Sequence, residues 1–146
     1  MPEKDYKIIE HTADIGIEVR ADDLAGLFGK AADAMFDIIV EVSHKSKKTN
    51  LVNANCKSIR IKLKAENLEE LFVDWLSELL YLYSVKELVF VGFKINKIEE
   101  TSIEAVAFGE GIAGYKVKTE IKAVTYHELE VKRTASGWQA KVIFDV

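Results

Sequence analysis

The chain has 146 residues, of which 49% are hydrophobic and 30% are charged, a balance that is typical of a folded globular protein and excludes general disorder. Lys and Arg number 20 and Asp and Glu number 24, so the formal net charge of −4 argues against a protein whose whole surface binds nucleic acid. The single cysteine, Cys56, excludes an intrachain disulfide and a cysteine-based zinc site, and it favours a reducing compartment, so we expect a cytoplasmic protein.

Neither membrane insertion nor export is predicted. The start of the chain is polar, so we expect no signal peptide. The densest apolar stretch, residues 68–83, is interrupted by four acidic residues, which excludes a membrane-spanning helix. The only proline is Pro2 and there is no linker-like segment, so we expect one domain over residues 1–146.

The first elements in chain order are two short strands and a helix. Residues 6–10 and 15–20 have the pattern of strands, the second with strict alternation of apolar and polar side chains, and residues 11–14 form a turn or bulge between them. Asp22 and Asp23 predict a helix start, and apolar residues at helical spacing then continue to Ile39.

A second helix is expected from Asn67, with Glu70 completing a capping box, and its apolar stripe continues to Tyr83. The pattern Leu-x-x-Leu-Phe occurs at residues 24–28 and again at 68–72, in phase with each stripe. One interpretation is an internal duplication of a strand–helix unit. The alternative is that any two amphipathic helices resemble each other at this level.

The remaining chain is rich in strands. Alternation predicts strands at residues 58–64, 89–95, 103–107, 115–124, 128–133 and 138–145, with a loop at 109–114 and a hairpin connection at 134–137. The chain thus has many strands and two helices, and strands and helices do not strictly alternate along it. This order indicates an α+β sandwich in which two helices pack on a mainly antiparallel or mixed sheet.

Two distant carboxylates are candidates for a site. The sequence ends with Asp145 and Val146; if Val146 is the terminus, its α-carboxylate would lie beside the Asp145 side chain. Hard divalent cations bind such oxygen clusters, whereas the alternative is a frayed, solvated terminus. Asp14 lies at the end of the first turn. It is a candidate ligand of the cation, and the alternative is that it is an ordinary turn residue. A central pairing of the first and last strands would bring Asp14 to Asp145.

Other polar residues have less specific patterns. His11 is a candidate proton carrier, metal ligand or structural hydrogen-bonding group. Lys122, Thr125 and His127 form a dense polar set in which the last two share a strand face; they could orient a ligand, or Thr125 and His127 could make cross-strand hydrogen bonds. The glycine loop lacks the Gly-Lys-Ser/Thr ending of a P-loop, and no hydrolase motif is present.

Residues 44–64 contain seven Lys and Arg residues and no acidic residue. This basic segment could contact RNA phosphates or an acidic partner, or it could be a solvated loop and strand face.

Five motifs in order resemble the archease family. They are residues 11–16 (His-Thr-Ala-Asp-Ile-Gly), the end of the first helix at 34–36 (Ala-Met-Phe), the second helix at 71–83, residues 121–127 (Ile-Lys-Ala-Val-Thr-Tyr-His) and the ending at 142–146 (Val-Ile-Phe-Asp-Val). The resemblance covers essentially the whole chain.

The resemblance implies a function that periodicity does not. Archeases are accessory proteins of the RtcB-type RNA ligase of tRNA splicing; they promote guanylylation of the ligase and its multiple turnover without being ligases themselves. It also implies a site for a divalent metal ion, Ca²⁺ in preference to Mg²⁺ or Mn²⁺, at Asp14, Asp145 and Val146. Glu41 is the nearest match to a further family acid after the first helix.

The implied partner is the ligase, with at most an indirect or weak contact with tRNA and none with a membrane. Two other function classes stay open. One is a metal-dependent phosphohydrolase, with His11 or His127 as the base. The other is a chaperone-like adaptor for enzymes that modify RNA or DNA, acting by binding alone.

Overall fold

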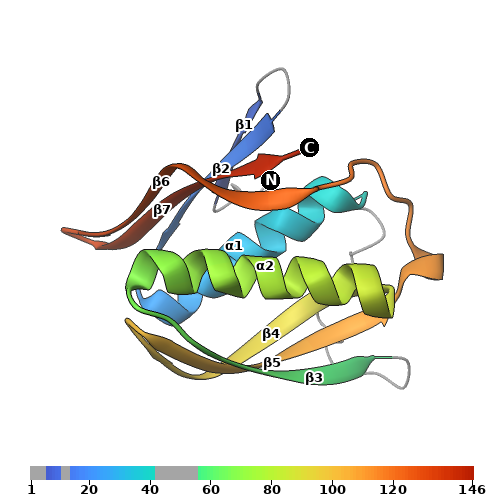
Figure 1. Ribbon diagram of the computed structural model, residues 1–146, viewed down its shortest axis with the longest axis horizontal. Coiled ribbons are helices and arrows are strands. Elements are labelled where there is room, and N and C mark those ends of the chain that lie inside the picture. The colour runs from blue at the N-terminus through green and yellow to red at the C-terminus, as the bar shows by residue number, and fades with distance from the viewer. Residues whose placement is uncertain (1–5, 11–13, 42–55) are drawn as a thin grey trace.

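The computed structural model describes residues 6–10, 14–41 and 56–146. Within these ranges the chain forms seven strands in two antiparallel sheets, and helices α1 (Leu24–Ile39) and α2 (Leu68–Lys86) lie between the sheets (Figure 1). The predicted α+β sandwich of two helices on antiparallel sheet is therefore confirmed, and its layers are sheet, helices and sheet.

The first sheet pairs the two ends of the chain. Its strands are β1 (Tyr6–Glu10), β2 (Asp14–Ala21), β7 (Gly137–Asp145) and β6 (Ala123–Thr134), in that spatial order. Strands β2 and β7 are central and pair along their whole length, from Asp14 opposite Asp145 to Ala21 opposite Trp138. This is the pairing that a shared carboxylate site requires.

The second sheet has the order β3-β5-β4, with β3 spanning Lys57–Lys64, β5 spanning Ser102–Gly111 and β4 spanning Leu88–Glu99. A short 3-10 helix, η3 (Ile112–Gly114), follows β5. The inward side chains of β3 are Ile59, Ile61 and Leu63, which pair with the inward residues of β5, so the alternation predicted for this strand is confirmed.

Both helices begin where their capping residues predict. The Asp23 side chain accepts a hydrogen bond from the Gly26 backbone N–H at 2.7 Å, and the Asn67 side chain accepts one from the Glu70 N–H at 2.8 Å. Each helix follows a strand after a short connection, β2 before α1 and β3 before α2. The strand–helix unit therefore occurs twice, while a duplication in ancestry stays a prediction.

The strand predicted over residues 115–124 is wrong for residues 115–122, because the backbone of this segment binds the C-terminal end of helix α1 instead of joining a sheet. The backbone N–H groups of Lys118 and Thr119 donate to the Ile39 carbonyl at 2.8 and 3.3 Å, and only an isolated bridge joins Val40 to Val117. Strand β6 begins at Ala123 and continues to Thr134 with an irregularity between Thr125 and Glu130. The predicted strand at 128–133 is therefore the second half of one longer strand.

The core lies between the sheets and around the helices. Trp75 of α2 is fully buried, and its indole N–H donates to the Phe28 carbonyl of α1 at 2.9 Å. Its ring also meets Phe93 of β4 edge-on, with centroids 5.8 Å apart. This side chain thus joins both helices and the second sheet. In the described part of the chain, no helix is long and apolar enough to cross a membrane.

Candidate functional site

Asp14 and Asp145 lie directly opposite each other at the paired ends of β2 and β7. Directly opposed residues of an antiparallel pair point to the same side of the sheet, with Cβ atoms about 4.5–5.5 Å apart. The alternating neighbour Phe144 is fully buried toward the helices, so both aspartates lie on the outer side of the sheet. Two opposed like charges destabilise a sheet unless a cation or hydrogen-bond donor compensates them.

Asp14 lacks such compensation at one of its oxygens. Its Oδ1 is buried and has no hydrogen-bond partner among the described residues, while the Asp145 residue is exposed. A buried acceptor without a donor costs about 1–3 kcal/mol, so natural structures rarely keep one without a water, ion or ligand. Carboxylate oxygens are the ligands that Ca²⁺ and Mg²⁺ prefer. The pair therefore suits a hard divalent cation.

The pair alone does not complete a cation site. In the ranges that the structure covers, no group of three or more His, Cys, Asp or Glu side chains could hold a metal ion. Val146 follows Asp145 directly, and its half-buried side chain packs against the core. Ca²⁺ takes six to eight oxygen ligands, so oxygen atoms from the main chain, water or a partner would have to supply the remainder.

Lys122 lies beside this strand end through its backbone. Its N–H donates to the Asp145 carbonyl at 2.7 Å, and the next residue, Ala123, pairs with Asp145 in the sheet. The Lys122 side chain is exposed. This contact holds the end of β7 in place between β2 and β6.

Thr125 and His127 make the local contacts that were the alternative to a ligand-orienting role. Thr125 Oγ1 donates to the Ile143 carbonyl of β7 at 2.9 Å, and it accepts from the His127 backbone N–H at 3.3 Å. His127 Nε2 lies 3.1 Å from Glu128 Oε2, on an exposed part of β6. The cross-strand hydrogen bond predicted as the alternative for Thr125 is confirmed.

Glu41 has its own partner. Its carboxylate lies 3.6 Å from Lys116 Nζ, and its backbone N–H donates to the Lys116 carbonyl at 3.1 Å. It does not join the two aspartates in a group of three acids among the described residues. His11 lies outside the described residues, as do the lysines at 45, 47 and 48 of the basic segment.

A second acidic cluster, on helix α1, was not predicted from the sequence. Asp37 of α1 is buried, and it accepts a hydrogen bond from the Tyr6 hydroxyl of β1. Burial, and then this hydrogen bond, raise the pKa of the Tyr6 hydroxyl well above its ordinary value, and Asp33 adds to the effect. The sequence signal is limited to the spacing of Asp33 and Asp37, which lie four residues apart and therefore share one face of the helix, away from its apolar stripe.

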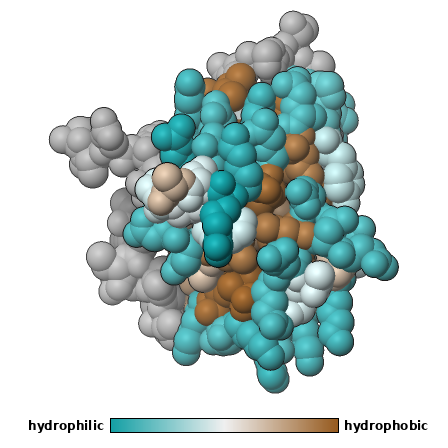
Figure 2. Space-filling model, turned by 90° about the vertical axis from the view of Figure 1, so that its left-hand side faces the viewer, coloured by the Kyte–Doolittle hydropathy of each residue, from teal (hydrophilic) through white to brown (hydrophobic). Residues whose placement is uncertain are grey.

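Two surface pockets lie at the other end of β2 and β7, on either side of Trp138. One, of about 310 Å³, includes Arg20 and Lys30 in its lining, and the other, of about 460 Å³, includes Lys132 and Arg133. Figure 2 shows this end of the molecule, where apolar side chains are exposed among polar ones. None of the predicted site residues that the structure describes lines either pocket.

Known proteins resemble this chain over nearly its full length. A family model described as the archease protein family (MTH1598/TM1083) matches residues 6–146. Proteins named archease from Methanosarcina acetivorans and Pyrococcus furiosus are 42% and 37% identical, with 98% of this chain and 97% and 99% of those proteins covered.

Two solved structures share the fold. The solution structure of a Methanobacterium thermoautotrophicum protein superposes with a TM-score of 0.71 at 28% identity, covering 99% of this chain and all of that one. The crystal structure of a Thermotoga maritima archease, described as a possible chaperone, superposes with a TM-score of 0.64 at 25% identity, covering 96% of each chain. The match of sequence and fold over the whole length shows that the chain belongs to the archease family.

Proposed function

We propose that this archease is an accessory protein of an RtcB-type RNA ligase, and that Asp14 and Asp145 promote guanylylation and multiple turnover of the ligase by holding a divalent cation. The observation that carries the proposal is the direct opposition of the two carboxylates, one of which has a buried oxygen with no donor in the part of the chain that the structure describes. Family membership supports an accessory role instead of a catalytic one.

Asp14 and Asp145 would hold the cation from neighbouring strands, with a main-chain oxygen of Val146 as a third protein ligand. Ca²⁺ is the favoured ion, because the incomplete and partly exposed ligand set suits its flexible coordination better than the strict octahedron of Mg²⁺. When bound, the cation would supply positive charge that attracts the phosphates of a nucleotide. The chain's own contribution is to fix two anionic groups on a rigid, central strand pair.

The test is ligation under multiple turnover, with the ligase in excess over the archease and with GTP and Mn²⁺ present. Asp14→Asn and Asp145→Asn remove charge while they keep the shape of each side chain, and we expect each to lose most of the activation. Asp22→Asn removes one exposed carboxylate just past the other end of β2 and serves as the matched control, which should activate like the parent. Full activation by both site variants would refute the role of the pair.

A chaperone-like adaptor is the second candidate, because the Thermotoga maritima relative is described as a possible chaperone. The described surface carries exposed aromatic and aliphatic side chains at Tyr81 and Val85 of α2 and Tyr126 of β6, which could bind an apolar partner surface. This function predicts the opposite result: both aspartate variants stay active, while Tyr81→Ser with Val85→Ser abolishes activation. The isolated protein should hydrolyse no generic phosphoester with Mg²⁺ or Mn²⁺ in either case.

A further inference from the structure

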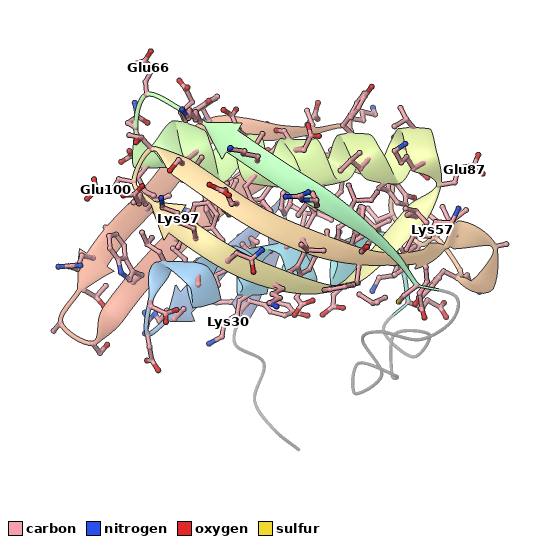
Figure 3. All side chains as sticks on the ribbon, turned by 90° about the horizontal axis from the view of Figure 1, so that it is seen from below. Lys30, Lys57, Glu66, Glu87, Lys97 and Glu100 are labelled. Carbon is pink, nitrogen blue, oxygen red and sulfur yellow. The ribbon has the colours of Figure 1, made fainter. Side chains whose placement is uncertain are left out.

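The outer face of the second sheet concentrates positive charge on an acidic protein. Inward positions of β3, β4 and β5 are apolar, so the alternate positions face away from the helices. These outward positions carry five cationic side chains, Arg60, Lys62 and Lys64 on β3 and Lys94 and Lys97 on β4, against three acidic ones, Glu99 on β4 and Glu104 and Glu110 on β5. We call these eight residues the basic sheet face; Figure 3 looks onto it, with Lys97 labelled.

The cations of this face are available to a partner. All five are exposed, and none makes an ion pair or a hydrogen bond with its side chain within the part of the chain that the structure describes. Of the two acids on the central strand, Glu104 lies opposite Lys62 on one side and Lys97 on the other, and Glu110 accepts a hydrogen bond from the Tyr115 hydroxyl. The face therefore has a local excess of positive charge, whereas the whole chain has a net charge of −4.

The arrangement is two rows of charge. Alternate residues of a strand are about 6.7 Å apart, and the two edge strands of a three-stranded sheet are about 9.5 Å apart. Arg60, Lys62 and Lys64 thus form one row, and Lys94 and Lys97 form a second row on the other side of β5. Rows of cations on a flat surface complement a ligand whose negative charges repeat along its length better than a small anion, which needs converging donors.

We infer that the basic sheet face binds the phosphate backbone of RNA without reading its sequence. The choice of RNA among polyanions rests on the proposed function as an accessory protein of an RNA ligase. Asp14 and Asp145 lie on the outer side of the other sheet, beyond both helices, so the two faces point in opposite directions (Figure 1). RNA would thus be held on one side of the archease while the ligase meets the carboxylates on the other.

A competing explanation is that lysines on edge strands prevent the sheets of different molecules from pairing. Both β3 and β4 are edge strands, so this explanation accounts for charge on them but predicts no affinity for RNA. Binding measurements on the full chain without the ligase separate the two explanations.

The experiment measures fluorescence anisotropy of a fluorescein-labelled RNA stem-loop at a series of salt concentrations. The triple variant Arg60→Gln, Lys62→Gln, Lys64→Gln should weaken binding at low salt by about tenfold or more. If all three side chains contact phosphates, the slope of log K against log salt should fall in magnitude by about 2–3, because each phosphate contact contributes about 0.7–0.9. The double variant Lys94→Gln, Lys97→Gln should weaken binding by a smaller factor.

The matched control removes the same amount of charge elsewhere, with Lys7→Gln, Lys86→Gln and Lys118→Gln, all exposed residues outside this face. The slope of log K against log salt for this control should differ from that of the parent by no more than the contribution of about one phosphate contact. Circular dichroism melts must show that all the variants fold.

The inference is overturned by a parent that binds no RNA at low salt, by equal losses in the triple variant and its control, or by binding only to acidic peptides or anionic lipid vesicles. Asp14→Asn with Asp145→Asn should bind RNA like the parent. Failure of the proposed ligase activation would therefore leave this result unchanged, and the two proposals can fail separately.

Discussion

The opposition of Asp14 and Asp145 has a measurable energetic consequence in the absence of metal. Two unit charges about 5 Å apart repel by about 0.8 kcal/mol at the dielectric constant of water and by about 3 kcal/mol at an effective dielectric constant of 20. Because Asp145 is exposed, the lower figure applies best. Asp145→Asn should therefore raise the free energy of unfolding by about 1 kcal/mol in a chelator, which corresponds to a melting temperature about 4 °C higher.

Addition of Ca²⁺ should make the parent more stable than the Asp145→Asn variant, which reverses the order of stability expected in the chelator. A ligand that binds only the folded state stabilises it by about 2.7 kcal/mol at a concentration one hundred times its dissociation constant. The parent should gain this stability and the Asp145→Asn variant should gain little. Differential scanning calorimetry in EDTA and in a Ca²⁺ series measures both effects.

The control for this prediction is Glu104→Gln on the second sheet. Glu104 lies opposite Lys62 and Lys97, so its loss should lower stability slightly or leave it unchanged in EDTA, and its response to Ca²⁺ should match the parent. A lower melting temperature for Asp145→Asn in EDTA, or an equal gain on Ca²⁺ addition in parent and variant, would refute the shared carboxylate site.

Three further predictions concern the fold. Trp75→Phe removes the indole donor to the Phe28 carbonyl and leaves a gap in the core, so urea unfolding should show a loss of about 2–4 kcal/mol. Tyr6→Phe should cost about 1–3 kcal/mol at neutral pH, because buried Asp37 loses a donor. Since folding raises the Tyr6 pKa, its contribution is complete below about pH 10 and is lost as the pH rises further, so Tyr6→Phe should flatten this alkaline decline in unfolding titrations. At Gly137, where φ is +152°, an added Cβ would lie 2.2 Å from the backbone oxygen of Ala21 at the end of β2, so Gly137→Ala should lower stability by more than about 1 kcal/mol in the same urea assay; an unchanged midpoint would contradict the close approach.

Local signals in the sequence were sufficient to predict most of the helices and strands. Capping residues Asp23 and Asn67 and the apolar stripes behind them specify both helices, because helix starts depend on contacts within four residues. Alternation likewise specified β3, since one of its faces is buried and the other is solvated. The family was also recognisable, because its motifs are contiguous short segments.

Residues 115–122 show where such local signals fail. The segment has alternating side chains, but its backbone donors Lys118 and Thr119 are used by the C-terminal end of α1, a partner almost 80 positions earlier in the chain. A pattern of side chains carries no information about which distant backbone group a donor will meet.

The sequence by itself determined most of the elements, the α+β class and the family, and it supplied the two acidic residues as candidates. Only the tertiary structure decided that Asp14 and Asp145 oppose each other, and that the lysines of β3 and β4 share one face of a second sheet. The physical reason is that strand register is set by the packing of whole sheets on the buried helices, because a shift by one residue would turn every buried side chain toward solvent. Helix caps and alternation are encoded over a few residues, whereas a site made from opposite ends of the chain exists only once the core has closed.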